Sequence, residues 1–227
     1  MYESKNSVYC YKGTNVLVNK MNIKDPIALK NYETSVIGLK LMALSKQGIT
    51  GKFDVSHFVS IHKFLFEDIY PFAGLFRTEN IAKDYFQFAE WEYIESELTR
   101  LLSELKSENF LVNLTKEKFA ERLAYYWAEL NVLHPFREGN GRTTREFLRQ
   151  LSLKNGYILN LHKISPQKLF NASIKSIIDT SDLEKYLYEL EWRLDYDLNI
   201  SCPDFHNIIK TGVNGLIIPD SIIEKML

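Results

Sequence analysis

The stretch His134-Pro-Phe-Arg-Glu-Gly-Asn-Gly-Arg-Thr-Thr-Arg145 lies between two predicted helices. Before it, apolar residues recur at the three- and four-residue spacing of one helix face: Phe119, Leu123, Trp127 and Leu130. Pro135 ends this helix, because a residue that precedes proline is pushed out of the α region. After the stretch the helical period begins again, and Asn155-Gly156 predicts a left-handed C-cap. The stretch is therefore a helix–loop–helix junction.

The glycines of this loop predict an anion site. Gly139 and Gly141 flank Asn140, and two glycines this close let the backbone take positive φ and let a ligand approach the amides. Successive amides at a helix N-terminus favour an anion, and the positive end of the helix dipole adds to this preference.

The charged residues of the loop narrow the ligand to a polyphosphate. Arg142 and Arg145 fall in the first turn of the second helix, where the dipole disfavours a cation unless a strong anion docks there. Glu138 would repel phosphate unless a divalent cation bridged the two, and Mg²⁺ commonly pairs one carboxylate with substrate phosphates. His134 supplies a base that titrates near neutrality.

Each of these residues also has an ordinary structural interpretation. A Gly-Asn-Gly turn is common connection chemistry, and a lone histidine on an apolar helix face is more often part of a core. For single residues the ordinary interpretation is favoured. The whole set within one loop favours a phosphate site with a metal and a base.

The loop resembles, without a gap, the signature of the Fic family, His-Pro-Phe-x-Asp/Glu-Gly-Asn-Gly-Arg-x-x-Arg. The segment 70–81 resembles the family's lead into a β-hairpin flap, and 86–89 resembles its return. Tyr11-Lys-Gly-Thr14 with Asn19-Lys20 resembles the entry of Fic domains from host-directed effectors and bacterial toxins. The resemblance covers residues 8–196 and implies an all-α fold, a helical bundle with a small β-hairpin flap over the active site.

The family resemblance implies transfer of AMP from ATP to a hydroxyl of a target protein, with pyrophosphate leaving. His134 would deprotonate the attacking serine, threonine or tyrosine hydroxyl. Glu138 would hold the Mg²⁺ that bridges the α- and β-phosphates. Asn140 would contact the α-phosphate, and Phe136 would anchor the loop.

The same resemblance assigns the remaining phosphate contacts. Gly139 and Gly141 would offer amides to the β-phosphate, Arg142 would bind the β-phosphate and Arg145 the γ-phosphate. Gly141 stands where the phosphate-transferring Doc branch of the family carries lysine, which favours nucleotidyl over phosphoryl transfer.

The flap is predicted within residues 71–88, where Gly74, Asn80 and Asp84 are turn residues between short runs. By resemblance, its edge would dock the target's modifiable segment by strand addition. Ile81, Ala82 and Lys83 are expected near the nucleotide and the target. The alternative is a plain loop that covers the site.

Regulation is also suggested by the resemblance. Many Fic proteins are inhibited by a helix bearing Ser/Thr-x-x-x-Glu-Gly/Asn, whose glutamate pairs with the second arginine of the motif. This chain has no full match, and the nearest is Thr180-x-x-x-Glu184, followed by Lys185. We therefore expect a separate small antitoxin chain, whose glutamate would meet Arg145.

The sequence leaves two other classes of function open. One is a related reaction, such as phosphoryl transfer, use of another nucleotide, or removal of AMP from a target. The other is a non-catalytic interaction module, against which His134 and Glu138 both argue, because a binding module needs neither a base nor a metal ligand.

Composition sets broader limits. The 227 residues suit one domain at 1–196, with an N-terminal extension, and a tail at 197–227 broken by proline and glycine. A net charge of −1 argues against a nucleic-acid binder. Cys10 and Cys202 are read as free thiols. With no signal peptide or membrane span in view, a cytoplasmic protein is expected, although specialised export would leave no visible trace.

Helices are predicted over 25–46, 53–68 and 94–105, and from Thr115, Ser165-Pro166 and Ser181. The helix after Ser165 is expected to bury Leu169, Ile174 and Ile177. His57 and His62 are five residues apart, a poor spacing for a shared metal, so we expect them to be packing or surface residues.

Overall fold

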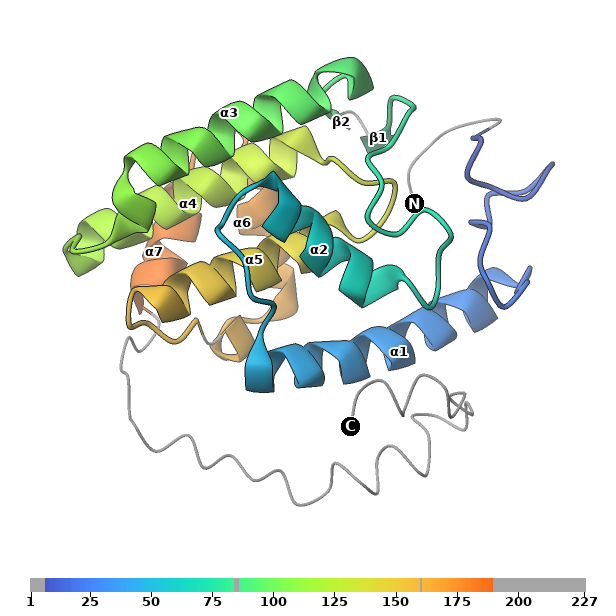
Figure 1. The fold of residues 1–227 in the computed structure, drawn as a ribbon, viewed down its shortest axis with the longest axis horizontal. Helices are drawn as coiled ribbons and strands as arrows, with labels where there is room; N and C mark the ends of the chain where they lie inside the picture. The colour runs from blue at the N-terminus through green and yellow to red at the C-terminus, as the bar shows by residue number, and fades with distance from the viewer. Residues whose placement is uncertain (1–6, 84–85, 160, 190–227) are drawn as a thin grey trace.

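The computed structural model describes residues 7–83, 86–159 and 161–189, which fold into a helical bundle with one small hairpin (Figure 1). The elements follow the chain as α1 (Pro26–Gln47), α2 (Val55–Phe66), β1 (Ala82–Lys83), β2 (Phe86–Gln87), α3 (Ile94–Ser107), α4 (Lys116–Leu133), α5 (Asn140–Lys154), α6 (Pro166–Lys175) and α7 (Ser181–Glu189). Short 3-10 turns lie at Trp91–Tyr93, Asn109–Leu111 and Leu161–Lys163. The predicted all-α fold with a small β-hairpin is confirmed.

Polar side chains define where several helices begin. A backbone N–H three residues further on donates to the side chain of each N-cap: Asp25, Asp54, Thr115 and Ser165. Such a cap satisfies an amide that has no partner inside the helix. A proline follows two of these caps, at a position where the missing N–H costs nothing. The helix starts predicted at Asp25, Thr115 and Ser165 are confirmed.

The helix predicted over 53–68 is shorter in the structure. Phe53 has a φ of 54°, in the left-handed region, and Asp54 accepts the His57 N–H at 2.9 Å. The cap therefore starts the helix at Val55, and α2 ends at Phe66. In contrast, α3 continues two residues beyond the predicted end, to Ser107.

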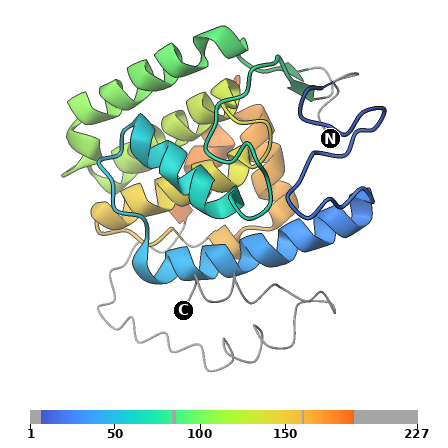
Figure 2. The same cartoon turned by 45° about the vertical axis from the view of Figure 1, so that its right-hand side comes forward.

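The centre of the bundle is formed by α4 and α5. α4 packs against α3, α5 and α7, while α2 packs against α5 and α1. In Figures 1 and 2, α1 lies along the lower side of the described bundle, and α3 lies at its top. The predicted inward residues of α3, α4 and α5 are buried, including Leu98, Phe119, Leu130 and Phe147. This packing fixes the directions of the two helices that meet at the loop.

One core assignment is wrong. Ile174 of α6 is 49% exposed, although its spacing predicted a core position. α6 instead turns Ala172 and the following Ser176 inward, and Leu169 and Ile177 are half-buried. Since α6 packs against α4 and α7 with a narrow face, small residues occupy its inner side.

The flap pairs antiparallel strands, with Ala82 opposite Gln87 and Lys83 opposite Phe86. A two-stranded hairpin is marginal alone in water. Here its return arm is tied to α4, since the Ala89 N–H donates to the Val132 carbonyl at 3.1 Å. The predicted hairpin within 71–88 is confirmed.

Two expectations about the end of the chain lie outside the described residues: the division between 1–196 and 197–227, and the free thiol at Cys202. Leu183 and Leu187 of α7 are buried, and Cys10 is a free thiol. In the described ranges, no helix combines the length and the apolar character that crossing a membrane requires.

Candidate active site

His134 ends α4 in a left-handed conformation, with φ 46° and ψ 58°. Its backbone N–H still donates to the Leu130 carbonyl at 3.1 Å, and Pro135 follows. The proline prevents another helical turn, and the left-handed residue turns the chain sharply. His134 thus stands at the start of the loop that leads to α5, as the sequence predicted.

Asn140 stabilises the loop from inside. Its Oδ1 accepts the Phe136 N–H at 2.8 Å, and its Nδ2 donates to the Phe136 carbonyl at 2.7 Å. Asn140 is buried and is the first residue of α5. The structure therefore shows a loop-holding role for this side chain, which the sequence had related to the α-phosphate only.

Phe136 anchors the loop, as predicted. Its ring is fully buried and stacks on His62 at 3.7 Å between ring centroids and on Phe58 at 5.7 Å. His62 also accepts the Gly74 N–H on Nδ1 at 2.8 Å, so its Nε2 donates to the Glu138 carbonyl at 2.9 Å. Burial lowers the pKa of His62 to about 4, which keeps the ring neutral. His62 is a packing residue, as expected, and it also holds the loop.

The two glycines differ in conformation. Gly139 has a φ of 85°, and a Cβ built there would lie 2.2 Å from the Phe66 ring. Gly141 lies within α5 and does not take positive φ, which corrects the prediction that both glycines serve this purpose. A Cβ on Gly141 would instead lie 3.2 Å from Nη1 of Arg145.

The imidazole of His134 is buried and neutral. Its Nδ1 lies 2.9 Å from the Asn131 carbonyl oxygen, so Nδ1 carries the proton and Nε2 keeps a lone pair. Phe88, which follows the flap, stacks on the ring at 3.8 Å. Burial is the main cause that lowers the pKa of His134 to about 4, and the charges of Arg77 and Lys83 act in the same direction.

Arg142 is held between two carboxylates. Its Nη1 lies 2.6 Å from Oε1 of Glu33, on α1, and its Nη2 lies 3.1 Å from Oε1 of Glu138. The Tyr70 hydroxyl also donates to Glu33. Burial lowers the pKa of Arg142, but Glu33 and Glu138 outweigh this effect and raise it. Glu33 was missed by sequence reasoning, because nothing in its local sequence relates it to a residue 109 positions away.

Arg145 has a different environment. It is half-buried, and among the described residues it forms no ion pair or hydrogen bond. Burial and the charge of Arg142 lower the pKa of its guanidinium. A cation that is desolvated beside another cation favours an anionic ligand. Arg142 and Arg145 together form the positive end of the candidate site.

The three flap residues, Ile81, Ala82 and Lys83, have different surroundings. Ile81 is buried and its carbonyl accepts the Phe88 N–H at 3.2 Å, so it anchors the hairpin. Ala82 and Lys83 are half-buried in β1. Nζ of Lys83 lies 4.6 Å from the ring centroid of Phe170, on α6, and its charge acts on His134.

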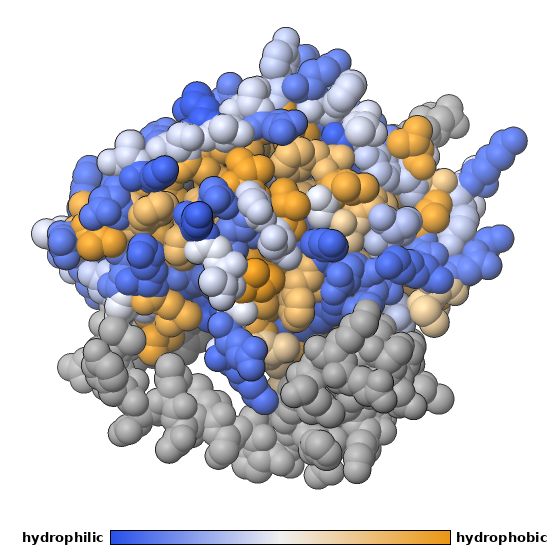
Figure 3. All heavy atoms as spheres, in the orientation of Figure 1, coloured by the Kyte–Doolittle hydropathy of each residue, from blue (hydrophilic) through white to orange (hydrophobic). Residues whose placement is uncertain are grey.

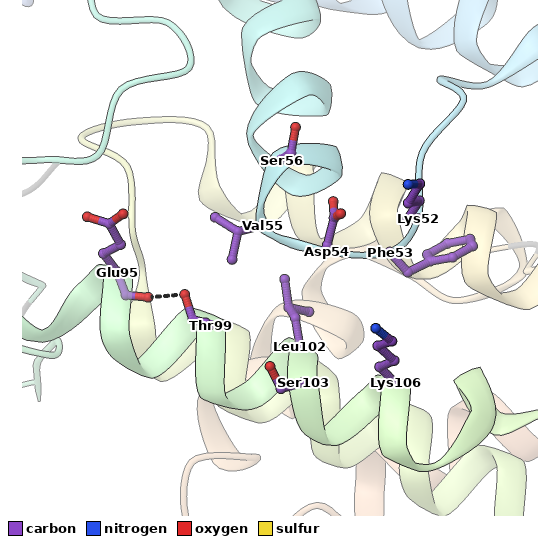
Figure 4. A pocket seen from close by; sticks show the side chains of 10 residues that line it. All are labelled: Lys52, Phe53, Asp54, Val55, Ser56, Glu95, Thr99, Leu102, Ser103 and Lys106. Carbon is purple, nitrogen blue, oxygen red and sulfur yellow. Dashed lines mark hydrogen bonds between the residues drawn. The ribbon is translucent and has the colours of Figure 1, made fainter.

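A hollow of about 380 Å³ lies elsewhere, between the start of α2 and α3 (Figure 4). Its lining includes Lys52, Val55, Leu102 and Lys106, and no residue of the 134–145 loop. Thr99 on this wall donates to its own helix at the Glu95 carbonyl, 2.7 Å away. The hollow is therefore separate from the candidate site.

The nearest match to an inhibitory helix is part of the core. Thr180 donates to the Glu184 carboxylate at the start of α7, where Leu183 and Leu187 are buried against the bundle. Glu184 thus makes a local side-chain contact with Thr180, and among the described residues it makes none with Arg145.

A helical bundle in which this loop joins α4 to α5 beneath a small hairpin is the architecture of Fic domains. The chain belongs to the Fic/DOC family, and the sequence pattern of that family matches residues 52–152. It is 41% identical over 182 residues to the protein adenylyltransferase VbhT of Bartonella schoenbuchensis, a match that covers 80% of this chain and 38% of VbhT. The chain is also 36% identical over 177 residues to the probable protein adenylyltransferase y4lH of Sinorhizobium fredii, covering 77% and 90% of the two chains.

Solved structures agree with this assignment. The N-terminal Fic domain of a VirB-translocated effector from Bartonella quintana, with bound ADP, is similar with a TM-score of 0.78 and 26% identity, covering 82% of this chain and 95% of that one. The BepC protein of Bartonella tribocorum, with bound AMPPNP, is similar with a TM-score of 0.75 and 26% identity, covering 82% and 97%.

Proposed function

We propose that this chain is a protein adenylyltransferase, which transfers AMP from ATP to a serine, threonine or tyrosine hydroxyl of a target protein. The observation that carries the proposal is that one loop joins a buried neutral imidazole, His134, to a helix start where Arg145 has no acidic partner among the described residues. The relatives named as adenylyltransferases, and the ADP and AMPPNP in similar structures, support a nucleotide substrate.

The base acts through Nε2 of His134. Because Nδ1 donates to the Asn131 carbonyl, Nε2 accepts the proton of the target hydroxyl as its oxygen attacks the α-phosphorus. The bond between the α-phosphorus and the oxygen that bridges to the β-phosphate breaks, and pyrophosphate leaves with that oxygen. A pKa of about 4 keeps the imidazole unprotonated at neutral pH, ready to act as an acceptor.

The start of α5 would hold the phosphates. The Gly139 N–H donates to Oε1 of Glu138 in this structure, and Gly141 has no Cβ beside the start of α5. Arg142 would bind the β-phosphate and Arg145 the γ-phosphate. Glu33 orients Arg142 before the nucleotide arrives. Since the Asn140 amide nitrogen has two protons and one binds the Phe136 carbonyl, the other would serve the α-phosphate.

Mg²⁺ is the cofactor that suits this donor set. Oε1 of Glu138 accepts the Gly139 N–H and an Arg142 N–H, whereas Oε2 accepts no hydrogen bond from the described residues. Those residues contain no cluster of three or more histidine, cysteine, aspartate or glutamate side chains that would form a metal cage. One carboxylate combined with substrate phosphates fits Mg²⁺. The ion would neutralise charge on the α- and β-phosphates.

A small antitoxin chain remains the partner that we propose for inhibition. Its glutamate would pair with Arg145, which the described residues leave without an acidic partner, and would displace the γ-phosphate. The target segment would add to the flap at Ala82 and Lys83. We also propose that the protein acts in the cytoplasm and that its Fic domain spans residues 1–196, with a separate tail at 197–227.

The proposal is tested with ATP labelled at either the α- or the γ-phosphate, Mg²⁺ and a cell lysate. We expect α-label, and no γ-label, on a protein whose mass increases by one AMP. His134→Ala should abolish this transfer, whereas His57→Ala, which removes a buried imidazole outside the loop, should retain it. Transfer of γ-label would indicate phosphoryl transfer, and no transfer with bound Mg-ATP would indicate an interaction module.

A further inference from the structure

Arg77 is a fully buried guanidinium that lies between α2 and the flap. Its side chain donates to backbone carbonyl oxygens of four described residues. Nε binds His134 O at 2.9 Å, Nη1 binds Glu79 O at 2.8 Å, and Nη2 binds Leu133 O at 3.3 Å as well as Ala89 O. The Arg77 backbone N–H also donates to the Pro135 carbonyl at 2.9 Å.

These contacts join both arms of the flap to the end of α4, which lies 56 to 57 residues beyond Arg77 along the chain. Glu79 lies on the arm that enters the flap, Ala89 lies on the arm that leaves it, and Leu133 and His134 form the end of α4. The last carbonyls of a helix have no partner inside the helix and carry the negative end of its dipole. A guanidinium satisfies them with several donors and an opposite charge. Arg77 therefore fixes both arms of the flap to the backbone of His134.

The backbone that Arg77 contacts is also conformationally demanding. His134 holds a left-handed conformation, which costs an L-residue about 1–2 kcal/mol. The carbonyl of this residue is the one that Nε of Arg77 binds. Because the return arm also places Phe88 on the His134 ring, movement of the flap would change the cover of the imidazole.

We propose that Arg77 is a positioning residue, which holds the flap and His134 in one fixed geometry so that a hydroxyl docked on the flap faces the imidazole. This inference rests on the proposed function for the hydroxyl, but the link between flap and base is a property of the fold. Lysine would keep the positive charge at this position but lose the planar guanidinium with its five N–H donors. A compact ammonium cannot donate to all of these carbonyl oxygens at once.

The test compares Arg77→Lys with Arg122→Lys, a matched change at a half-buried guanidinium on α4 that pairs with Glu104 and Glu108. Hydrogen exchange is measured over residues 79–89, together with Mg-ATP affinity by calorimetry and transfer of α-label to lysate proteins. In Arg77→Lys, we expect flap amides to exchange at least tenfold faster and transfer to fall at least tenfold, with Mg-ATP affinity within threefold of wild type. Arg122→Lys should leave flap exchange and transfer unchanged.

Flap exchange within twofold of wild type in folded Arg77→Lys would overturn the proposal, as would an equal loss of transfer in Arg122→Lys. If the wild-type chain transfers no label, the proposed function fails, while flap exchange still decides the role of Arg77. If Arg77→Lys does not fold, the link between the flap and His134 is tested by native-state hydrogen exchange of the wild-type chain in urea. The amides of Phe88, Ala89 and His134 should then open as one cooperative unit, and separate opening would refute the link.

Discussion

The two glycines of the loop are required for different physical reasons. Gly139 combines a φ of 85° with a close approach to Phe66, so both its backbone conformation and its lack of Cβ are needed to form the loop. Gly141 has a helical backbone, and its missing Cβ leaves space beside the Arg145 guanidinium. The first glycine is therefore required for folding, and the second is the one that we propose for ligand binding.

Alanine at these two positions should separate folding from binding. Gly139→Ala should destabilise the protein by more than about 2 kcal/mol, since a left-handed alanine and a contact with Phe66 both cost free energy. Gly141→Ala should leave stability unchanged or raise it by up to about 1 kcal/mol, because alanine favours a helix. It should nevertheless lower Mg-ATP affinity about tenfold, or about 1.4 kcal/mol.

Urea unfolding and calorimetry measure the two effects. Equal stability of the two variants, or Mg-ATP affinity in Gly141→Ala equal to wild type, would contradict this division between the glycines.

The flap and the end of α4 form one structural unit around His134. The Ala89 N–H donates to Val132, Arg77 binds both flap arms, and Phe88 covers the His134 ring. A short hairpin that would be marginal alone thus becomes a defined wall of the site.

Removal of the ring that covers the base should slow transfer. In Phe88→Ala, the His134 imidazole loses its stacking contact and gains water, so we expect kcat to fall about tenfold or more, about 1.4 kcal/mol in the barrier. The KM for ATP should change less than kcat. Steady-state transfer of α-label measures both constants.

Phe86→Ala is the control on the same hairpin. Phe86 packs edge-on against Phe88 at 5.2 Å and has no ring contact with His134 among the described residues. An equal fall of kcat in both variants would show that general loosening of the flap, rather than loss of cover on the base, is responsible.

The whole bundle buries two imidazoles at the site. The 134–145 loop joins α4 to α5, and α1 and α2 contact it through Glu33 and His62. On the face shown in Figure 3, hydrophobic residues gather over the middle, with hydrophilic residues around them. His62 and His134 are both buried, and the pKa of each is lowered to about 4. The folded protein therefore resists protonation that the unfolded chain accepts.

This difference predicts loss of stability in mild acid. An unfolded histidine titrates near pH 6.5, so between pH 6.5 and 4 the unfolded chain binds protons that the native protein excludes. Stability is therefore full above pH 6.5 and falls as the pH is lowered toward 4. From pH 7 to pH 5, each histidine should account for about 2 kcal/mol.

Urea unfolding at pH 7, 6 and 5 measures this loss. His62→Asn should remove about half of the pH dependence between pH 7 and 5, even if it lowers stability at pH 7. An unfolding free energy that stays constant from pH 7 to pH 5 would refute neutral burial of both histidines.

The local features of the fold and the site could be read from the sequence. Caps such as Asp25, Thr115 and Ser165, and the proline after His134, act on their own neighbours, so short stretches suffice to place them. The family resemblance of the 134–145 loop then indicated the fold, and the structure confirmed it. The start of α2 was misjudged although its cap, Asp54, is a local feature of the sequence. The exposure of Ile174 was misjudged because it depends on which face of α6 packs against α4 and α7.

The sequence by itself determined that a loop which begins with a histidine and contains two glycines would join two helices. It also determined that this loop would present arginines to an anion. Only the tertiary structure decided which partners hold that loop. Glu33 meets Arg142 across 109 positions, His62 meets Glu138 across 76, and Arg77 meets His134 across 57. Such contacts leave no local pattern, because they exist only after packing of the helices has brought distant backbone and side chains within hydrogen-bond distance.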